Sequence, residues 1–416
     1  MRILLIILLL PAQMVFAQQE IRLKDCYEWA RENYPNLKQS ELYSETSGLK
    51  IQNLKTNFLP STTLKGQATY QSEVTKIDVP IPNIEIPSIS KDQYKLYLEF
   101  QQNIWDGGLT ESQKQLEETI LKTNLSQLET ELYQLKEKVN QAWFSALSAK
   151  KNIQILETQQ TILNEKLKLL ESGIKNGVIE TSNADVLKAE ILITGQTIIE
   201  VEAGYQTALR ILSILTGRGL KEPVVLITGS AALDEGQLSR PELALFKSQA
   251  NQLDSKAGLL DKTRNPKIFG FGQGGIGRPG LNMLSNDFDP YYLVGVGVSW
   301  NPFDWQKTKR EKQIIGLQKE LVLAQQETFE QNISILLAQQ LETMQKIEKL
   351  IETDQEIIGL RQKIADASAS KLENGTINSA DYIADLNAAT IAQLKLETHK
   401  IQLEEAIVKY NTIKGI

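Results

Sequence analysis

The sequence predicts a mainly α-helical protein with a small β part, built from two similar halves. Two stretches of helical periodicity are far longer than the helices of ordinary globular domains, and each ends at an Asn-Gly turn. A pair of short alternating segments precedes each long stretch, so the same order of elements occurs twice. The formal net charge of −6 and the absence of a long Lys or Arg run argue against nucleic acid as a partner.

The N-terminus has the features of a secretory signal peptide. One arginine precedes an apolar core from Ile3 to Leu10, and Val15 and Ala17 form the cleavage pattern before Gln18. We therefore expect residues 1–17 to be removed and the mature protein to leave the cytoplasm. No later stretch has the roughly 18 consecutive apolar residues of a membrane-spanning helix, so entry into a membrane would need another structure.

The long helical stretches run from Leu109 to Ser172 and from Phe303 to Asn374. In the first, Leu, Ile, Gln, Glu and Lys recur at helical spacing without a single Gly or Pro. At about 1.5 Å per residue it would form a helix roughly 95 Å long. A narrow apolar seam with polar flanks is typical of a coiled coil.

Each long stretch stops at a turn and restarts at once as helix, around Asn176-Gly177 and Asn374-Gly375. Glycine takes the left-handed conformation that ends a helix, and Ser or Thr caps the next one. Two helical hairpins about 200 residues apart indicate an internal duplication. We expect a first repeat at 18–217, a linker or equatorial segment at 218–236 with a short strand at Val224–Ile227, and a second repeat at 237–416. Each repeat would hold a helix, two strands and a long helical hairpin.

Four segments have strand character. In the second and fourth, apolar residues alternate with small or polar ones, which fits both a half-buried soluble sheet and a membrane strand. Aromatic residues near both ends of the strands favour the membrane, because transmembrane barrels carry such residues at the two interfaces. The segments are Ser61 to Ser72, Gln93 to Trp105, Pro266 to Gly277 and Tyr291 to Trp300. The expected interfacial girdle comprises Tyr70, Tyr94, Trp105, Tyr291, Tyr292, Trp300 and Trp305.

Four strands cannot close a barrel within one chain, because an open sheet edge in lipid leaves backbone groups unsatisfied. Several copies would have to share one barrel, and the strand pattern alone leaves their number open. The loops Glu73 to Asp92 and Arg278 to Pro290 would lie outside the membrane, on the side away from the helices.

Residues 270–280 read GFGQGGIGRPG and contain a formal match to the dinucleotide-binding pattern G-x-G-x-x-G. A dinucleotide loop opens a helix and is followed by an acidic ribose ligand. Here Pro279 and a loop follow instead. We assign these glycines to a strand, where they relieve crowding as the sheet curves.

Catalytic and metal-binding chemistry has little support. Cys26 is the single cysteine and His399 the single histidine, so neither a disulfide framework nor a Cys/His metal cluster can form. His399 lies in a strongly helical run, and the carboxylates have ordinary surface spacing. We expect no enzyme, no metal and no cofactor.

Six motifs give the sequence a family resemblance: it resembles TolC-like outer membrane efflux proteins. With the long helices, the motifs cover nearly the whole mature chain, and their order and duplication are specific. They lie at Leu23–Glu41, Asn57–Gly66, Tyr94–Gly108, Asn176–Glu190, Ser239–Gln249 and Tyr292–Trp305.

The resemblance implies a homotrimer. Its shared twelve-stranded barrel would lie in outer membrane lipid and continue into the periplasm as a long antiparallel α-helical barrel. Such proteins are passive exit ducts of tripartite efflux or type I secretion systems, and they dock to a periplasmic adaptor (membrane fusion) protein and an inner membrane pump. The cargo and the type of pump stay open.

Two other functions remain possible from the residues themselves. One is a structural or adhesive outer membrane protein with a coiled-coil stalk, and the other is a soluble periplasmic coiled-coil scaffold. The polar strand face of Lys95, Glu99, Gln101 and Asn103 favours a wet lumen and hence the duct.

By position, the resemblance assigns adaptor docking and the channel aperture to the hairpin tips at Lys175–Asp185 and Glu373–Asp385. Asp381 and Asp385 lie one helical turn apart, so in a trimer they could form acidic rings that favour cations, or an ordinary solvated helix face. The apolar Ile174, Val178, Ile179 and Ile377 suit either a partner or packing of the hairpin arms. The candidate tip residues are Asn176, Gly177, Val178, Asp185, Asn374, Gly375, Thr376, Asp381 and Asp385.

The sequence departs from the family pattern in three places. The second strand-to-helix junction has Gln306-Lys307 where the first has Gly107-Gly108, so we expect the two halves to enter the helical part differently. Thr376 fits the tip pattern less well than Val178. No Arg or Tyr matches the family's gate-locking contacts.

Overall fold

The computed structural model describes residues 19–75, 89–177, 179–220, 224–227, 232–233 and 236–416. The expected signal peptide and Val178 lie outside these ranges. The chain divides into two compact units. The helical unit comprises Met1–Leu37, Glu129–Pro241 and Phe329–Ile416, and the strand unit comprises Lys38–Leu128 and Glu242–Thr328.

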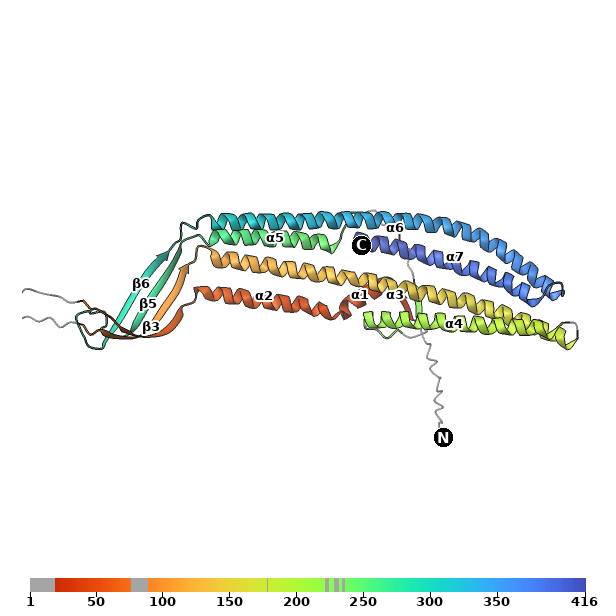
Figure 1. Cartoon of the computed structure of the whole chain (residues 1–416), viewed down its shortest axis with the longest axis horizontal. Helices are drawn as coiled ribbons and strands as arrows, with labels where there is room; N and C mark the ends of the chain where they lie inside the picture. Colours follow the sequence, from red (N-terminus) through yellow and green to blue (C-terminus); the bar gives the residue numbers. More distant parts are fainter. Residues whose placement is uncertain (1–18, 76–88, 178, 221–223, 228–231, 234–235) are drawn as a thin grey trace, which may run out of the picture. The chain divides into compact units, whose positions relative to one another are not determined.

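Each half of the chain contains a helical hairpin (Figure 1), and the corresponding helices of the two hairpins have equal lengths. Helices α3 (Leu109–Lys175) and α6 (Lys307–Glu373) have 67 residues each, and α4 (Thr181–Thr216) and α7 (Ser379–Lys414) have 36 each. This agreement confirms the two expected hairpins and supports the internal repeat. None of the described helices is apolar enough over a sufficient length to cross a bilayer.

The strand unit contains a four-stranded antiparallel sheet in the order β2-β3-β5-β6. All four predicted strands are confirmed, and no end differs from its predicted position by more than two residues. Helices α2 (Gln39–Lys55) and α5 (Pro241–Lys262) precede the two strand pairs. The strands are β2 (Ser61–Tyr70), β3 (Asp92–Trp105), β5 (Lys267–Arg278) and β6 (Asp289–Ser299).

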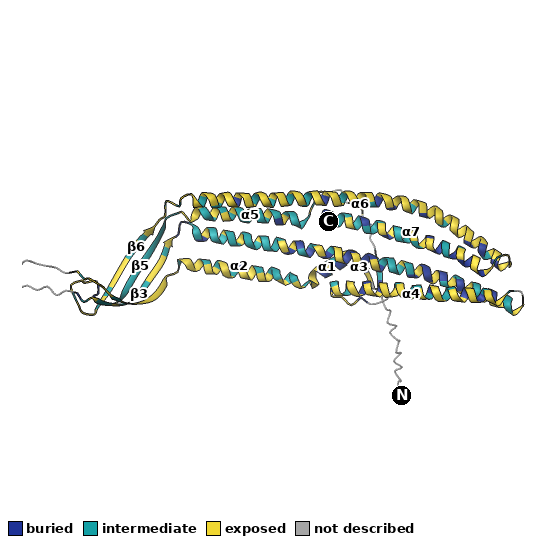
Figure 2. Cartoon of the chain, viewed as in Figure 1, coloured by how far each residue is buried: buried dark blue, intermediate teal, exposed yellow. Residues whose placement is uncertain are grey.

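One face of the sheet is apolar and exposed. Val294, Val296 and Val298 of β6 are 77%, 69% and 69% exposed, and Figure 2 shows β6 and much of β3 in the colour of exposed residues. Side chains of this kind are normally buried in a soluble protein. Their exposure along alternate positions is the pattern of a lipid-facing strand.

The opposite face of the sheet is polar and glycine-rich. Glu99 of β3 pairs with Lys65 of β2 and accepts a hydrogen bond from Gln273 Nε2 of β5 at 3.3 Å. On the same face the ring of Phe271 covers Gly295 on the neighbouring strand, where an added Cβ would lie 2.6 Å from Phe271 Cζ. The motif GFGQGGIGRPG thus begins inside β5, and the expectation that its glycines belong to a strand is confirmed.

The helical unit contains a small parallel sheet that sequence analysis found only in part. The predicted strand Val224–Ile227 (β4) is present, and it pairs with β1 (Gln19–Arg22), which the sequence analysis missed. Ile21 of β1 is fully buried with Cys26 of α1 (Leu23–Asn33) and Trp143 of α3 in one hydrophobic core. A short 3₁₀ helix follows at Pro35–Lys38 (η1), and a second one, η2 (Thr56–Phe58), lies in the strand unit.

Candidate functional site

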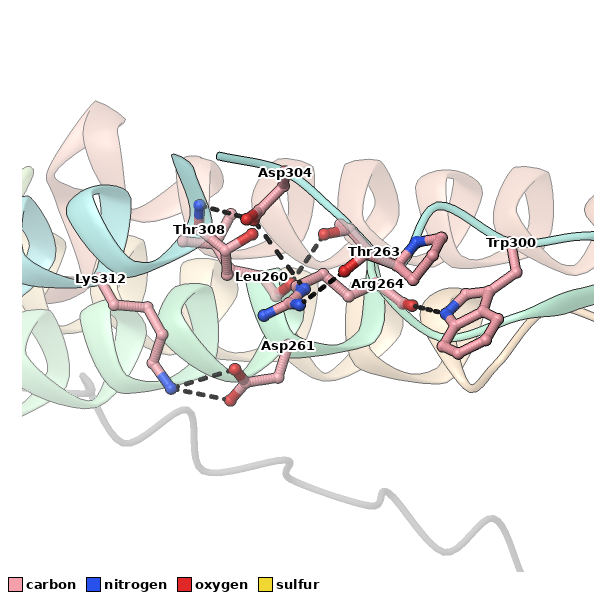
Figure 3. Close-up of polar contacts among 9 residues, drawn as sticks. Leu260, Asp261, Thr263, Arg264, Trp300, Asp304, Thr308 and Lys312 are labelled. Atoms are coloured by element: carbon pink, nitrogen blue, oxygen red, sulfur yellow. Dashed lines mark hydrogen bonds and ion pairs between the residues drawn. The ribbon is translucent and has the colours of Figure 1, made fainter. Parts of the chain in front are cut away.

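The strand-to-helix junctions of the two halves are capped in the same way. Asp106 accepts hydrogen bonds from the backbone N–H of Gly108 at 3.0 Å and of Thr110 at 2.7 Å. Asp304 accepts one from the backbone N–H of Thr308 at 2.9 Å (Figure 3). Each carboxylate therefore satisfies N–H groups that the first turn of the long helix leaves without an intrahelical partner.

The backbone at both junctions is left-handed. Gly107 and Gly108 have φ of 73° and 83°, and Trp305 and Gln306 have φ of 52° and 61°. The structural counterpart of Gly107-Gly108 is therefore Trp305-Gln306, and the expectation that the halves enter the helical part differently is wrong for the backbone. Helix α6 starts at Lys307 rather than at the expected Phe303 because left-handed residues cannot belong to a right-handed helix.

The second junction is braced by Arg264 (Figure 3). Its guanidinium donates from Nη2 to Pro302 O at 3.2 Å, and its Nε lies 3.9 Å from Asp304 Oδ2. Trp300 Nε1 donates to the carbonyl of Arg264 at 3.1 Å, and Lys312 pairs with Asp261 at 2.9 Å. Helix α5, the end of β6 and the start of α6 are thus linked within the strand unit.

The carboxyls of Asp106 and Asp304 at the two junctions both have lowered pKa values. Burial alone would raise the pKa of Asp106, but hydrogen bonds from the Thr110 side chain and from nearby backbone N–H groups outweigh it and hold the pKa below its usual value. Hydrogen bonds from the hydroxyl and N–H of Thr308, assisted by Arg264, lower the pKa of Asp304. Both groups are therefore charged at neutral pH, as N-terminal caps should be.

The predicted girdle aromatics lie near the strand ends, but not all on one face. Tyr292 is 79% exposed on the apolar face, whereas Tyr291 lies opposite Gly275 on the polar face. A register shift after Asn103 places Trp105 opposite Ile268, on the apolar side. The other exposed members are Tyr70, Tyr94, Trp300 and Trp305.

The two hairpin turns have the same geometry. Gly177 and Gly375 have φ of 72° and 67°, and their N–H groups donate to Ile174 O and Leu372 O at 2.9 and 3.0 Å. Asn176 and Asn374 immediately precede these glycines. In the second turn both the N–H and the hydroxyl of Thr376 donate to Lys371 O, so this residue closes the turn despite its departure from the family pattern.

The candidate tip carboxylates have different surroundings. Asp381 and Asp185 are exposed, and Asn378 caps α7 by accepting a hydrogen bond from the Asp381 N–H at 2.9 Å. Asp385 instead accepts a hydrogen bond from the Ser368 hydroxyl of α6. Only Asp381 of the predicted pair is therefore fully available to solvent or to ions.

Ile179 and Ile377 pack against a buried cluster near the hairpin ends that includes Leu163, Leu187 and Tyr382. These two isoleucines therefore pack the hairpin arms together, which is one of the two roles expected from the sequence; the other was contact with a partner. Burial raises the pKa of Tyr382 to about 12, with Glu373 and Asp366 adding to the effect. Ile174 lines a separate hollow of about 370 Å³ on the α3–α4 hairpin, beside Lys175 and Asp185.

Polar contacts tie the α6–α7 hairpin to the α3–α4 hairpin. Asn387 of α7 accepts a hydrogen bond from Gln159 Nε2 at 2.6 Å and donates from Nδ2 to Glu190 Oε1 at 2.9 Å. Nearer the turns, the Ser379 N–H donates to Asn183 Oδ1 at 2.9 Å, and Lys166 pairs with Glu373. We call these residues the hairpin clamp: Gln159, Lys166, Asn183, Glu190, Glu373, Ser379 and Asn387. Local sequence patterns do not predict this set, because the partners are far apart in sequence and each is an ordinary polar residue of a helix surface.

Residues 26–218 match the profile of the family described as outer membrane efflux protein. The matched segment is just under half of the chain and contains the first helical hairpin, so this half resembles outer membrane efflux proteins. Channels of this kind lie in the outer membrane, with their helical part in the periplasm. The family is one of channels, not of enzymes. No curated protein matches the sequence.

Solved channel structures share the fold. The CmeC outer membrane channel of Campylobacter jejuni is 15% identical, with a TM-score of 0.62 over 94% of this chain and 85% of its own. The outer membrane protein VceC of Vibrio cholerae is 14% identical, with a TM-score of 0.63 over 94% of each chain. The open state of the Neisseria gonorrhoeae MtrE channel is 14% identical, with a TM-score of 0.64 over 95% and 89%.

Proposed function

We propose that this protein is an outer membrane efflux protein and forms the passive exit duct of a tripartite efflux or type I secretion system. The observation that carries the proposal is the sheet: one apolar, exposed face, one polar face with Lys65 and Glu99, and two outer strands that each pair on one side among the described residues. Such a sheet is one segment of a larger wet barrel.

Three copies would close that barrel. Unpaired backbone groups cost several kcal/mol each in lipid, so the free edges of β2 and β6 require partners. Three four-stranded sheets give twelve strands, the number that the family resemblance implies. The girdle aromatics would then mark the two membrane interfaces, with Trp105, Trp300 and Trp305 on the periplasmic side.

The hairpin tips are the proposed docking surface for a periplasmic adaptor, which would link the duct to an inner membrane pump. The two turns, at Asn176-Gly177 and Asn374-Gly375, are exposed and similar in geometry, so both could meet repeated features of one partner. The hollow beside Lys175 and Asp185 offers a further polar contact.

The hairpin clamp is the proposed restraint on the aperture. Helix α7 carries Asp381 at its start, and the clamp fastens this part of α7 to α3 and α4 through Asn387 and Ser379. Movement of the α6–α7 hairpin away from the α3–α4 hairpin would require these contacts to break. The clamp would thus replace the Arg and Tyr contacts that the sequence lacks.

The alternative, a structural or adhesive protein with a coiled-coil stalk, needs no conducting lumen. The polar sheet face favours the duct, because an anchor has no need of charged groups such as Lys65 and Glu99 on the barrel interior.

The test is to purify the full-length mature protein from membranes in mild detergent, measure its oligomeric mass, and record from it in a planar bilayer. A trimer with discrete conductance steps supports the duct. A trimer without conductance supports the stalk, and a monomer that stays soluble without detergent supports the periplasmic scaffold.

A further inference from the structure

A hollow of about 510 Å³ lies on the apolar face of the sheet, near the end away from the helices. Its lining comes from three neighbouring strands and the loop before β6. Gly66 and Ala68 of β2 form its floor, opposite Leu96 and Tyr94 of β3. Ile276 and Phe288 complete the lining, and the Tyr94 and Phe288 rings lie 6.3 Å apart at its border.

The backbone does not require a glycine at position 66. Its φ is not positive, and an added Cβ would lie 3.7 Å from Leu96 Cδ1, an ordinary van der Waals contact. Glycines on the polar face differ: a Cβ at Gly295 or Gly297 would lie 2.6 or 2.5 Å from a phenylalanine ring. Strand interiors normally disfavour glycine. What Gly66 provides is the space that a side chain would fill.

Water is a poor occupant of this space. The side chains around it are almost all hydrocarbon, and Leu96 and Ile276 are 57% and 52% exposed. A hollow of this size is within the range of ligand pockets, about 300 to 1,000 Å³. It is continuous with the apolar face that the outer membrane covers, so bilayer lipid is the material in contact with it.

We propose that the hollow binds one acyl chain of an outer membrane lipid, seated between Gly66 and Leu96 and covered at its loop end by Tyr94 and Phe288. The proposal rests on the lipid-facing sheet of the proposed function and adds a defined lipid site to it. The hydrocarbon part of the lipid is recognised, because apolar burial is the main interaction that the lining offers.

The test uses the full-length protein in vesicles of phosphatidylethanolamine and phosphatidylglycerol. A small fraction of the phosphatidylethanolamine carries a photoreactive diazirine on its acyl chain. After irradiation, mass spectrometry measures the label on each strand. Gly66→Leu fills the hollow with an apolar side chain of the kind that neighbouring positions of this face carry. Gly274→Leu is the matched control, because it makes the same change on the same face where no atom lies within 4 Å of an added Cβ.

We expect peptides from β2 and the first half of β3 to carry about fourfold more label than β6, the ratio expected for one more buried methylene group. Gly66→Leu should reduce this label to the level of β6, and Gly274→Leu should leave it unchanged. Equal labelling of all strands, or labelling that Gly66→Leu does not alter, overturns the proposal. Label on β6 without label on β2 also overturns the proposal, because a neighbouring copy of the chain, and not lipid, would then cover the hollow. If no strand is labelled, the membrane-embedded sheet of the proposed function fails as well.

Discussion

Asp106 and Asp304 hold equivalent positions at the two strand-to-helix junctions. Each carboxylate accepts a hydrogen bond from the N–H of the threonine four residues later, at 2.7 Å from Thr110 and 2.9 Å from Thr308. The two longest helices of the chain therefore begin in the same way, although the residues between each Asp and Thr differ completely. The cap, and not the sequence around it, is what the two halves share.

Removal of the first cap should destabilise the protein. Asp106→Ala should lower the free energy of unfolding by about 1 kcal/mol, the usual cost of losing an N-terminal cap. Asp106→Asn keeps an acceptor oxygen and should cost less. Thermal unfolding of the purified protein, followed by circular dichroism, distinguishes the two variants; equal losses would mean that the charge alone matters.

The same caps should give the protein an acid-sensitive step. The folded-state pKa values of Asp106 and Asp304 lie below the ordinary value, near 3.9 for an unfolded chain. Their contribution to stability is therefore complete above about pH 4 and is lost as the pH falls through the lower folded-state values. In Asp106→Asn the fall in melting temperature below about pH 4 should be smaller than in the wild type.

Substitutions at the left-handed residues of the two junctions should change the stability of the protein in opposite directions. Gln306→Gly should stabilise the protein by up to about 1 kcal/mol, because glycine adopts positive φ without a steric penalty. Gly108→Ala should destabilise it through φ alone, since the nearest atom to an added Cβ is 3.8 Å away. Gly107→Ala should cost more, because its methyl group would also overlap Asn265. The order of the three melting temperatures checks this; a Gly107→Ala variant as stable as Gly108→Ala would contradict it.

The phenylalanine rings on the polar sheet face should make Gly295 sensitive to any side chain. Gly295→Ala should cost about 1 to 3 kcal/mol, the usual range for overpacking, because the methyl group meets the Phe271 ring. Gly272→Ala, on the other face, has 3.6 Å to its nearest atom and should be tolerated. The measurement is the temperature at which the proposed trimer dissociates in detergent. Recovery of the Gly295→Ala variant by Phe271→Leu would identify the ring as the cause.

Loss of Asn387 should weaken the hairpin clamp. Asn387→Ala removes the hydrogen bonds to Gln159 and Glu190. At about 1 kcal/mol each, the loss of both bonds corresponds to roughly a thirtyfold shift of the equilibrium towards a widened aperture. Planar bilayer recordings should show larger or more frequent conductance steps. Gln393→Ala, an exposed amide on the same helix, is the control. Recordings identical to the wild type would exclude the clamp as a restraint.

The acidic residues at the start of α7 should affect divalent cations that block the channel. Asp381→Asn together with Asp385→Asn should reduce block by these cations, and Asp381→Asn alone should account for most of the effect because Asp385 is engaged by Ser368. Asp185→Asn, an exposed carboxylate of the other hairpin, should have little influence. Unchanged block in the double variant would remove the ring hypothesis.

Local patterns predicted the long helices, both hairpin turns and all four membrane strands, because periodicity and Asn-Gly turns are properties of adjacent residues. The pairing of β1 with β4 was missed because Gln19 and Val224 are far apart in sequence and β1 has only four residues. The clamp was missed for the same reason. The left-handed turn at the second junction was not predicted, because no glycine marks it. Trp305 and Gln306 adopt there a conformation that their side chains disfavour.

Among the described residues, β2 and β6 each pair on one side only, and this has a genetic consequence for the proposed shared barrel. Each chain would supply only part of the barrel wall, so a copy with one damaged edge would still assemble with wild-type copies through its intact edge and leave the barrel incompletely closed. Mutant alleles of this kind should therefore be dominant over the wild type in cells that express both, whereas alleles that prevent folding altogether should be recessive.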